Sequence, residues 1–176
     1  MEPRYNVRVS ETAVGRERLL QYCQGDGIDI GYGGDPIRPE AIAMDLLKPY
    51  RSAGDRPQHL SGDCKNLHWF RDGVLDYVYS SHLLEDFAET KDILVEWLRV
   101  IKPGGNLVLF LPDQPSYKRF CEVTGQRGNQ HHVYANFGFE FVKDIVDTIP
   151  NVEIIHHSGI VNLYCFEVVV KKNGQT

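Results

Sequence analysis

Long hydrophobic runs are absent from this 176-residue sequence. The longest purely apolar run is Leu107–Leu111, far short of the roughly 20 residues that a membrane-spanning helix needs. The amino-terminal residues contain no apolar stretch of the kind found in secretory signal peptides. We therefore expect a cytoplasmic protein with no membrane partner.

Closely spaced metal-ligating residues are also missing. The four cysteines lie far apart and form no Cys-x-x-Cys pair, so neither a zinc cluster nor a redox motif is indicated. Histidines at the helical spacing His-x-x-x-His are absent, and the carboxylates are scattered along the chain. We expect no metal site, and the cysteine usage agrees with a reducing compartment.

Positive charge is not in excess. Lys and Arg number 19 against 24 Asp and Glu, which gives a formal net charge of −5. A protein that grips nucleic acid needs a basic face, so we expect a small-molecule partner and no nucleic acid. Apolar residues make up 42% and charged residues 24%, a balance typical of globular proteins. The length predicts one domain spanning residues 1–176.

Short apolar segments alternate with amphipathic ones along the chain. The apolar segments predict strands at Gly27–Ile30, Ala41–Met44, Gln58–Ser61, Val74–Tyr79, Asn106–Leu111, Val152–His157 and Val161–Lys171. Helical spacing predicts helices at Ser10–Gln24, within an amino-terminal helical segment 1–24, and at Asp86–Ile101 and Phe139–Ile149. This alternation indicates an α/β fold with a mostly parallel sheet, in which the closing pair supplies an antiparallel strand near the carboxyl terminus.

Glycine or a polar side chain follows each of the first five predicted strands. The residues at these ends are Gly31, Asp45, Asp63, Ser80 to His82, and Asp113. In open α/β sheets, ligands bind outside the carboxyl ends of the strands. Although each position alone is an ordinary turn residue, the five in order indicate one ligand cleft.

The glycine turn after the first strand resembles a dinucleotide-binding loop but departs from it in two places. Pro36 occupies the position of the third glycine, and Asp45 comes 14 residues after Gly31 where the fingerprint has its acid about 20 residues on. The short connection leaves no room for the long helix that a pyrophosphate favours. The turn therefore suits a ligand with adenosine and no phosphates, which disfavours a nucleotide-dependent oxidoreductase.

Five motifs between Gly27 and Asp113 together resemble the class I S-adenosylmethionine-dependent methyltransferases. They are Asp29-Ile30-Gly31-Tyr32-Gly33, Ala43-Met44-Asp45, Ser61-Gly62-Asp63-Cys64, the fourth-strand segment Leu75–Asp86, and the helix-turn-strand segment Leu98–Phe110. The resemblance implies a three-layer Rossmann-like fold with a mixed seven-strand sheet, and S-adenosylmethionine as cofactor.

The resemblance also implies a role for each motif residue. Gly31 and Gly33 would let the backbone approach the cofactor, Asp29 would favour the methionine ammonium, and Asp45 would accept from the ribose hydroxyls. Asp63 and the Cys64 amide would hold the adenine. Three further cofactor contacts are implied at Tyr32, Leu46 and Ser80.

The acceptor side is predicted from the residues after the fourth and fifth strands. His82 could take a proton near neutral pH, or it could merely contact the ligand or pack locally. Residues 114–136 are too long and too polar for a plain connector, so we expect an inserted substrate loop that closes over the acceptor, with a solvated insertion as the alternative. Within it, His131 and His132 are candidate catalytic residues, and Tyr117 and Tyr134 are candidate substrate contacts.

The predicted function is methyl transfer to a small-molecule or sugar-like acceptor that the sequence does not identify. The short first crossover keeps one alternative open, a cofactor-binding module of the same fold without turnover. The oligomeric state is left open by the sequence.

Overall fold

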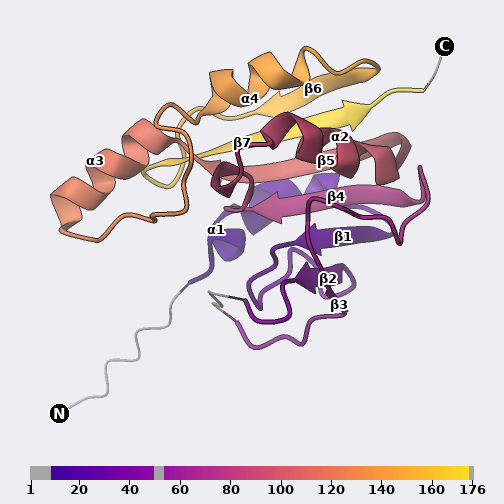
Figure 1. Ribbon diagram of the computed structural model, residues 1–176, viewed down its shortest axis with the longest axis horizontal. Coiled ribbons are helices and arrows are strands. Elements are labelled where there is room, and N and C mark those ends of the chain that lie inside the picture. The colour runs from indigo at the N-terminus through magenta and orange to yellow at the C-terminus, as the bar shows by residue number, and fades with distance from the viewer. Residues whose placement is uncertain (1–8, 50–53, 175–176) are drawn as a thin grey trace.

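The computed structural model describes residues 9–49 and 54–174, and the strands of this part of the chain form one sheet of seven. Their order is β3-β2-β1-β4-β5-β7-β6, and β7 runs antiparallel to both of its neighbours (Figure 1). The strands are β1 (Gly27–Ile30), β2 (Ile42–Asp45), β3 (Leu60–Ser61), β4 (Leu75–Ser81), β5 (Ile101–Pro112), β6 (Val152–His157) and β7 (Cys165–Lys172). The predicted fold class, a mostly parallel seven-strand sheet with an antiparallel strand near the carboxyl terminus, is confirmed.

Helices cover both faces of the sheet. They are α1 (Glu11–Leu19), α2 (Thr90–Val100), α3 (Gln114–Thr124) and α4 (Phe139–Val146), with short 3-10 turns η1 (Leu20–Tyr22) and η2 (Leu84–Asp86). Apolar side chains of α2 and α4 pack on one face of the central strands, and those of α1 pack on the other. These two cores make the three layers of the predicted Rossmann-like arrangement.

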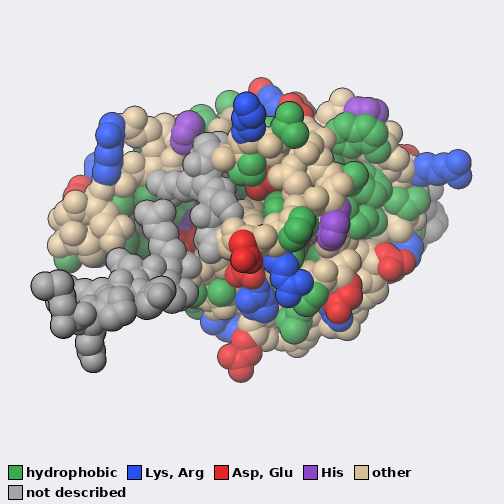
Figure 2. All heavy atoms as spheres, turned by 90° about the horizontal axis from the view of Figure 1, so that it is seen from below, with side chains coloured by type: hydrophobic (Ala, Val, Ile, Leu, Met, Phe, Trp, Pro, Cys, Tyr) green, Lys and Arg blue, Asp and Glu red, His purple; other side chains and the backbone are tan. Residues whose placement is uncertain are grey.

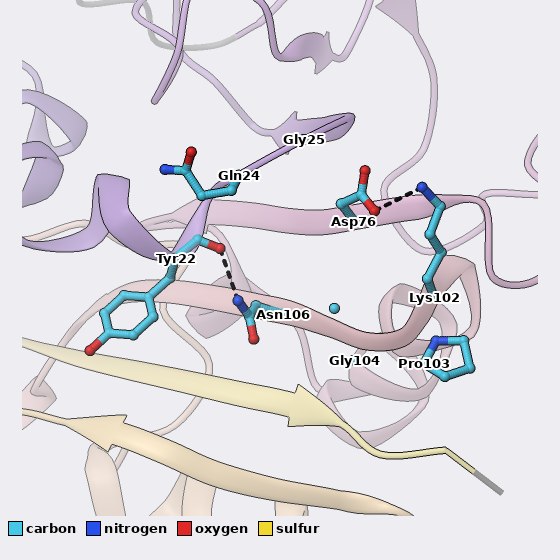
Figure 3. Close-up of a pocket in the computed structure, with 9 residues that line it drawn as sticks. Tyr22, Gln24, Gly25, Asp76, Lys102, Pro103, Gly104 and Asn106 are labelled. Atoms are coloured by element: carbon cyan, nitrogen blue, oxygen red, sulfur yellow. Dashed lines mark hydrogen bonds and ion pairs between the residues drawn. The ribbon is translucent and has the colours of Figure 1, made fainter.

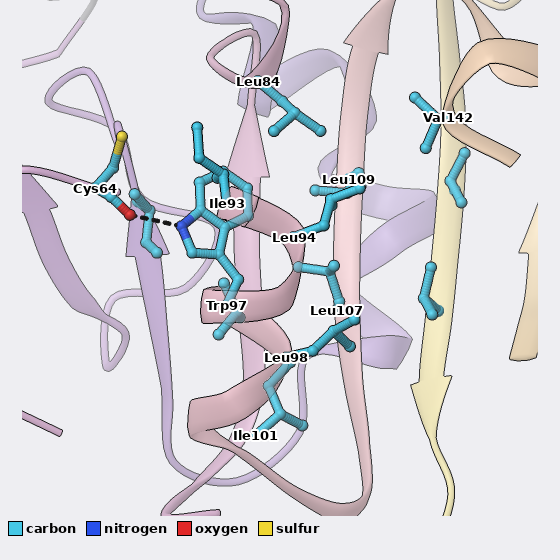
Figure 4. Packing of buried hydrophobic residues seen from close by; sticks show 14 of the residues in the cluster. Cys64, Leu84, Ile93, Leu94, Trp97, Leu98, Ile101, Leu107, Leu109 and Val142 are labelled. Atoms are coloured by element: carbon cyan, nitrogen blue, oxygen red, sulfur yellow. Dashed lines mark hydrogen bonds between the residues drawn. The ribbon is translucent and has the colours of Figure 1, made fainter. Parts of the chain in front are cut away.

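Helix α2 is held on the sheet by a fully buried tryptophan. Its apolar stripe, which includes Leu94, Trp97 and Leu98, lies against Leu107 and Leu109 of β5 (Figure 4). The Trp97 indole Nε1 donates to the carbonyl of Cys64 at 2.8 Å, so the buried ring keeps its polar atom satisfied. The same contact fixes the turn that follows β3.

Segment Gln114–Asn136, predicted to be a loop, begins instead with helix α3. The Asp113 side chain caps the helix by accepting from the Ser116 amide at 3.0 Å, Pro115 lies in its first turn, and Gly125 ends it in the left-handed conformation. The high polarity of the segment concealed the helix, because α3 has no buried residue. Figure 1 shows α3 projecting beyond the carboxyl end of β5.

Two other connections bear on the predictions. The described residues between β1 and β2 contain no helix, as the short first crossover predicted. The last strand, predicted from Val161, starts only at Cys165, because Asn162 and Leu163 adopt positive φ angles of 46° and 73° that no strand accommodates. The amino-terminal prediction falls partly on residues 1–8, which lie outside the described residues, and α1 begins at Glu11.

The surface carries charges of both signs. On the face shown in Figure 2, the described Lys and Arg side chains are interspersed with Asp and Glu and with apolar side chains. Within residues 9–49 and 54–174, every helix is too short or too polar to cross a membrane.

Truncation of the buried Trp97 side chain should destabilise the protein strongly. Trp97→Ala should lower the free energy of unfolding by about 3–5 kcal/mol, because it removes a buried ring and leaves the Cys64 carbonyl without its donor. Urea unfolding measures the change. Val95→Ala, on the exposed side of the same helix, is the control and should change stability by less than about 0.5 kcal/mol; equal effects of the two substitutions would contradict this account of the core.

Candidate functional site

The register of the parallel strands gathers the predicted site residues at one edge of the sheet. Ile30 at the end of β1 lies opposite Met44 of β2 and Ser80 of β4. The buried Ser80 hydroxyl donates to the Ile30 carbonyl at 2.9 Å and ties the two strands together at the point where the chain order reverses. This switch point, between β1 and β4, is where an open α/β sheet offers its binding crevice.

The turn after β1 needs glycine for two reasons. Gly31 and Gly33 have φ angles of 71° and 58°, in the left-handed region. A Cβ on Gly31 would also come within 2.8 Å of the Leu83 side chain. The Gly31 amide donates to the Met44 carbonyl at 2.8 Å, which holds the turn against the end of β2.

Asp29 lies within β1 and its carboxyl group is fully buried. One oxygen accepts from the Ile37 amide at 2.6 Å, and the other has no hydrogen-bond partner among the described residues. Burial raises the pKa of this carboxyl group to about 8. Asp29 therefore fixes Ile37, which follows the glycine turn in the chain. Its other carboxyl oxygen is still available to a donor.

Asp45 at the end of β2 is positioned by the glycine turn itself. Its Oδ2 accepts from the Gly33 amide at 3.3 Å and its Oδ1 accepts from the Leu46 amide at 2.8 Å. The carboxyl group is half-buried, and this burial raises its pKa. Leu46, the next residue, leaves 46% of its surface exposed and so offers an apolar surface beside Asp45.

The turn after β3 presents a carboxylate to solvent above a buried cysteine. Asp63 is exposed and accepts from the Lys65 amide at 2.9 Å, whereas the Cys64 side chain is buried. Trp69 is 54% exposed and packs over Gly62, where a Cβ would lie 2.5 Å from its ring. An indole beside the turn predicted to hold adenine is a feature that the sequence analysis missed.

Tyr32 is buried, and its hydroxyl donates to the Arg56 carbonyl at 2.6 Å. In the same region, the Gly54 amide donates to the Gly33 carbonyl at 3.2 Å and the Arg56 amide donates to the Gly34 carbonyl at 3.1 Å. Residues 54–56, which lie before β3 in the chain, are thus held against the glycine turn. The Tyr32 hydroxyl serves this fastening.

His82 leaves the end of β4 with a positive φ of 50°, and its amide donates to the Phe110 carbonyl at 2.9 Å. Its Nε2 lies 3.4 Å from Cys165 Sγ and 3.7 Å from a carboxylate oxygen of Glu11. Burial lowers the pKa of this imidazole to about 3. The ring is therefore neutral at physiological pH and is a weak base there.

The two adjacent histidines after α3 have different environments. His131 is exposed, whereas the side chain of His132 is only 4% exposed. His132 Nδ1 lies 2.5 Å from Gln114 Oε1, and its ring centroid lies 5.0 Å from that of Tyr117. The structure therefore brings His132 and Tyr117 to the carboxyl end of β4 and β5 and leaves His131 outside.

Glu85 lies between His82 and His132, and the sequence analysis did not single it out. Its side chain is 1% exposed, with Oε1 3.8 Å from His82 Nδ1 and 3.7 Å from His132 Nε2. Burial raises the pKa of this carboxyl group well above its usual range. The sequence offered one signal for Glu85, namely that it is a carboxylate three residues after the candidate His82.

The two tyrosines predicted to contact the substrate, Tyr117 and Tyr134, have different surroundings. The Tyr117 hydroxyl accepts from the Asn129 amide at 3.0 Å, and its ring lies 5.1 Å from that of Tyr164. The Tyr134 hydroxyl donates to the Ala88 carbonyl at 2.7 Å and its ring packs on Phe141, so Tyr134 anchors the segment after α3 to the start of α2. Tyr164, which donates to Glu11 at 2.9 Å, is a further aromatic neighbour that the sequence analysis missed.

A surface hollow lies at the opposite edge of the sheet. Its lining comes from residues that precede β1 and that begin β4 and β5 (Figure 3), namely Tyr22, Gln24, Gly25, Asp76, Lys102, Pro103, Gly104, Gly105 and Asn106. An ion pair of 2.7 Å between Lys102 and Asp76 crosses it. None of the predicted site residues lines this hollow, so the carboxyl edge of the sheet remains the candidate site.

Comparison with known families gives one match that covers more than half of the chain. Residues 11–109 match the model of a family described as a methyltransferase domain. These residues contain α1, β1 to β4, α2 and most of β5, and therefore most of the candidate site. No curated protein matches the chain.

Solved structures share the fold at low sequence identity. The PH0226 protein from Pyrococcus horikoshii is 16% identical with a TM-score of 0.71, over 98% of this chain and 97% of that one. An S-adenosylmethionine-dependent methyltransferase from Mesorhizobium loti is 12% identical with a TM-score of 0.68, over 95% and 100%. One from Archaeoglobus fulgidus is 17% identical with a TM-score of 0.68, over 94% and 96%.

The buried carboxyl group of Asp29 predicts a pH-dependent stability. Its pKa rises from the ordinary 3.8 to about 8 on folding, so the folded state binds the proton more tightly. This contribution is complete below about pH 4 and is lost as the pH rises through 8. Asp29→Asn keeps an acceptor for the Ile37 amide but has no proton to lose.

We therefore expect the melting temperature of the wild type to fall more between pH 5 and pH 8.5 than that of Asp29→Asn. Thermal unfolding at several pH values measures the difference. Asp92→Asn, at an exposed position on α2, is the control and should follow the wild type. Parallel curves for the wild type and Asp29→Asn would show that this carboxyl group does not titrate as its burial predicts.

Proposed function

Because the chain belongs to the methyltransferase-domain family, we propose that it binds S-adenosylmethionine at the carboxyl ends of β1 to β4 and transfers the methyl group to a small-molecule acceptor. The chain is thus an enzyme whose cofactor is S-adenosylmethionine. The acceptor, a small molecule or a sugar-like compound, is the part that goes beyond family membership.

The observation that best supports the cofactor assignment is the bond between Asp45 and the glycine turn. Since the Gly33 amide holds one oxygen of Asp45, the carboxylate is fixed at the end of β2, where it would accept from two ribose hydroxyls. Leu46 adds an apolar surface on one side of the adenosine. Asp63 and the Cys64 amide would bind the adenine from the neighbouring turn.

The methionine end of the cofactor would lie toward β4. There the missing Cβ of Gly33, whose place is open apart from the Gly31 carbonyl, would let the ligand come close to the backbone, and Ser80 would hold β1 and β4 together beneath the sulfonium. The unpartnered oxygen of Asp29 would accept from the methionine ammonium. Tyr32 would contribute by fastening the segment 54–56 over this end of the cleft.

The acceptor would occupy the side of the crevice formed by His82, Tyr117 and His132. Methyl transfer is a displacement at a carbon that the sulfonium already activates, so the protein mainly has to hold the nucleophile in line. The neutral His82 would contact the acceptor, since its low pKa makes it a poor proton acceptor. His132, oriented by Gln114, is better placed to take a proton from the acceptor. Tyr134 and His131 would act at the rim.

The alternative of a cofactor-binding module without turnover has one observation in its favour, the short first crossover, which carries no helix. The segment 54–56 is hydrogen-bonded to the carbonyls of Gly33 and Gly34 on this crossover. The formation of S-adenosylhomocysteine with a panel of hydroxyl, amine and thiol acceptors distinguishes the two functions. A cytoplasmic setting is part of the proposal and is supported by the four free cysteines.

Asp45→Ala should weaken the binding of S-adenosylmethionine by about 1.5–3 kcal/mol, the range for a hydrogen bond to a charged group. Calorimetric titration of the wild type and the variant measures the change. Asp144→Ala, on the exposed side of α4, removes the same charge far from the crevice and should bind as the wild type does. An unchanged affinity in a folded Asp45→Ala protein would refute the ribose contact.

The adjacent histidines offer a matched pair of substitutions for the acceptor side. His132→Ala should lower turnover about 100-fold or more, the usual contribution of a positioned proton acceptor, while the affinity for S-adenosylmethionine stays the same. His131→Ala should change turnover less than about threefold, because its side chain is exposed. Equal losses of turnover from the two variants, or a loss of cofactor affinity as large as the loss of turnover, would contradict the proposed contact of His132 with the acceptor.

A further inference from the structure

Helix α1 is joined by polar contacts to the first crossover, residues 31–41, which the structure describes throughout and which carries no helix. The Arg16 guanidinium donates to a carboxylate oxygen of Asp35 at 2.6 Å. It also donates to the Pro36 carbonyl at 3.0 Å and to the Ile37 carbonyl at 3.3 Å. One side chain of α1 thus holds three consecutive residues directly after the glycine turn.

Ser10 adds a second link at the start of the helix. Its hydroxyl oxygen caps α1 by accepting from the Ala13 amide at 2.9 Å, and its proton is donated to Oδ2 of Asp35. Since Arg16 binds Oδ1, both oxygens of this carboxylate are occupied by α1 and its cap residue. The beginning and the middle of the helix are therefore tied to the same point of the crossover.

The helix itself is fixed on the sheet. Gly15 lies so close to β5 that a Cβ there would come within 3.2 Å of the Phe110 ring, and Leu19 is fully buried. The side chain of Arg18 forms an ion pair of 2.5 Å with the buried Glu167 of β7. Because α1 is anchored to two strands, it can hold the crossover in place instead of moving with it.

The residues that Arg16 holds are connected to the predicted cofactor contacts. The Asp35 amide donates to the Tyr32 carbonyl at 3.0 Å and closes the glycine turn. The Ile37 amide donates to Asp29 at 2.6 Å, and the Ile37 side chain is only 1% exposed. A displacement of residues 35–37 would therefore disturb the glycine turn and Asp29 together.

We propose that α1, acting through Arg16 and Asp35, supports the glycine turn in place of the helix that the first crossover lacks. A crossover between parallel strands usually contains a helix of its own that packs on the sheet. Arg16 and Asp35 are thus positioning residues that act on the cofactor through the turn. This inference rests on the proposed function, because it takes S-adenosylmethionine as the ligand of the turn.

The exposure of the ion pair separates this role from a general contribution to stability. The side chains of Arg16 and Asp35 are 32% and 31% exposed, and ion pairs at such positions add little to the free energy of unfolding. The ion pair of Arg18 involves a carboxylate that is 1% exposed, so its loss should destabilise the fold more. Arg18→Ala is therefore a control on the same helix for the effect of lost stability.

Calorimetric titration with S-adenosylmethionine is the first test. Arg16→Ala should weaken binding about tenfold or more, because the apparent affinity falls with the fraction of molecules whose turn is correctly placed. Arg18→Ala should leave the affinity unchanged. Arg16→Lys keeps the charge but loses the planar fork that reaches three acceptors, and should give an intermediate affinity. Arg16→Ala should also cost less affinity in an Asp35→Ala background than in the wild type, since the two residues act as a pair.

Amide hydrogen exchange of the protein without ligand measures the support of the turn directly. Arg16→Ala should raise the exchange rates of the amides of residues 31–37 about tenfold or more, whereas Arg18→Ala should leave them as in the wild type. Circular dichroism checks that each variant is folded.

Unchanged affinity or unchanged exchange in folded Arg16→Ala, or equal effects of Arg16→Ala and Arg18→Ala, would overturn the proposal. A wild-type protein that does not bind S-adenosylmethionine would refute the proposed function instead, and the exchange rates would still decide whether α1 supports the turn.

Discussion

The alignment of β2, β1, β4 and β5 is the constraint on which the site depends. Parallel strands end at the same edge of a sheet, and here the register places Ile30 opposite both Met44 and Ser80. The central strands are buried on both faces, so a shift by one residue would move apolar side chains out of two cores at once. The glycine turn, Asp45 and His82 are neighbours in space because this register holds.

Polar groups in the interior link the fold to the site. Asp29 inside β1 holds the Ile37 amide beneath the glycine turn, and Trp97 on α2 holds the carbonyl of Cys64 in the turn after β3. Glu85 has no such partner, and it lies where the acceptor would enter. The first two groups would position the cofactor side, whereas burial raises the pKa of the Glu85 carboxyl group well above its usual range and so favours its neutral form.

Motifs formed by consecutive residues were predictable from the sequence. The acid and glycines from Asp29 to Gly33 and the acids Asp45 and Asp63 are local patterns, and the structure places them along one edge of the sheet. The short first crossover was also readable, because only ten residues separate Gly31 from Ile42. Helix α3 was missed although Asp113, Pro115 and Gly125 gave the usual signals of its ends. Its solvated side chains concealed the helical pattern.

Features that depend on distant contacts were not predictable. No spacing in the sequence distinguishes His131 from His132, and only the packing of the segment after α3 buries one and exposes the other. The meeting of His82, Glu85 and His132 joins residues about fifty positions apart, so no local motif reports it. Trp69 covers Gly62 at the surface, a contact that no spacing in the sequence indicates.

A crystal structure of the protein with S-adenosylhomocysteine tests the central claim, that this edge of the sheet is the cofactor site of a methyltransferase. The account predicts ribose hydroxyls on the Asp45 carboxylate, adenine beside Asp63 and Cys64, and the sulfur directed toward Ser80 and His82. Binding in the hollow lined by Asp76, Lys102 and Asn106, or a crevice that the ligand does not enter at millimolar concentration, would contradict it.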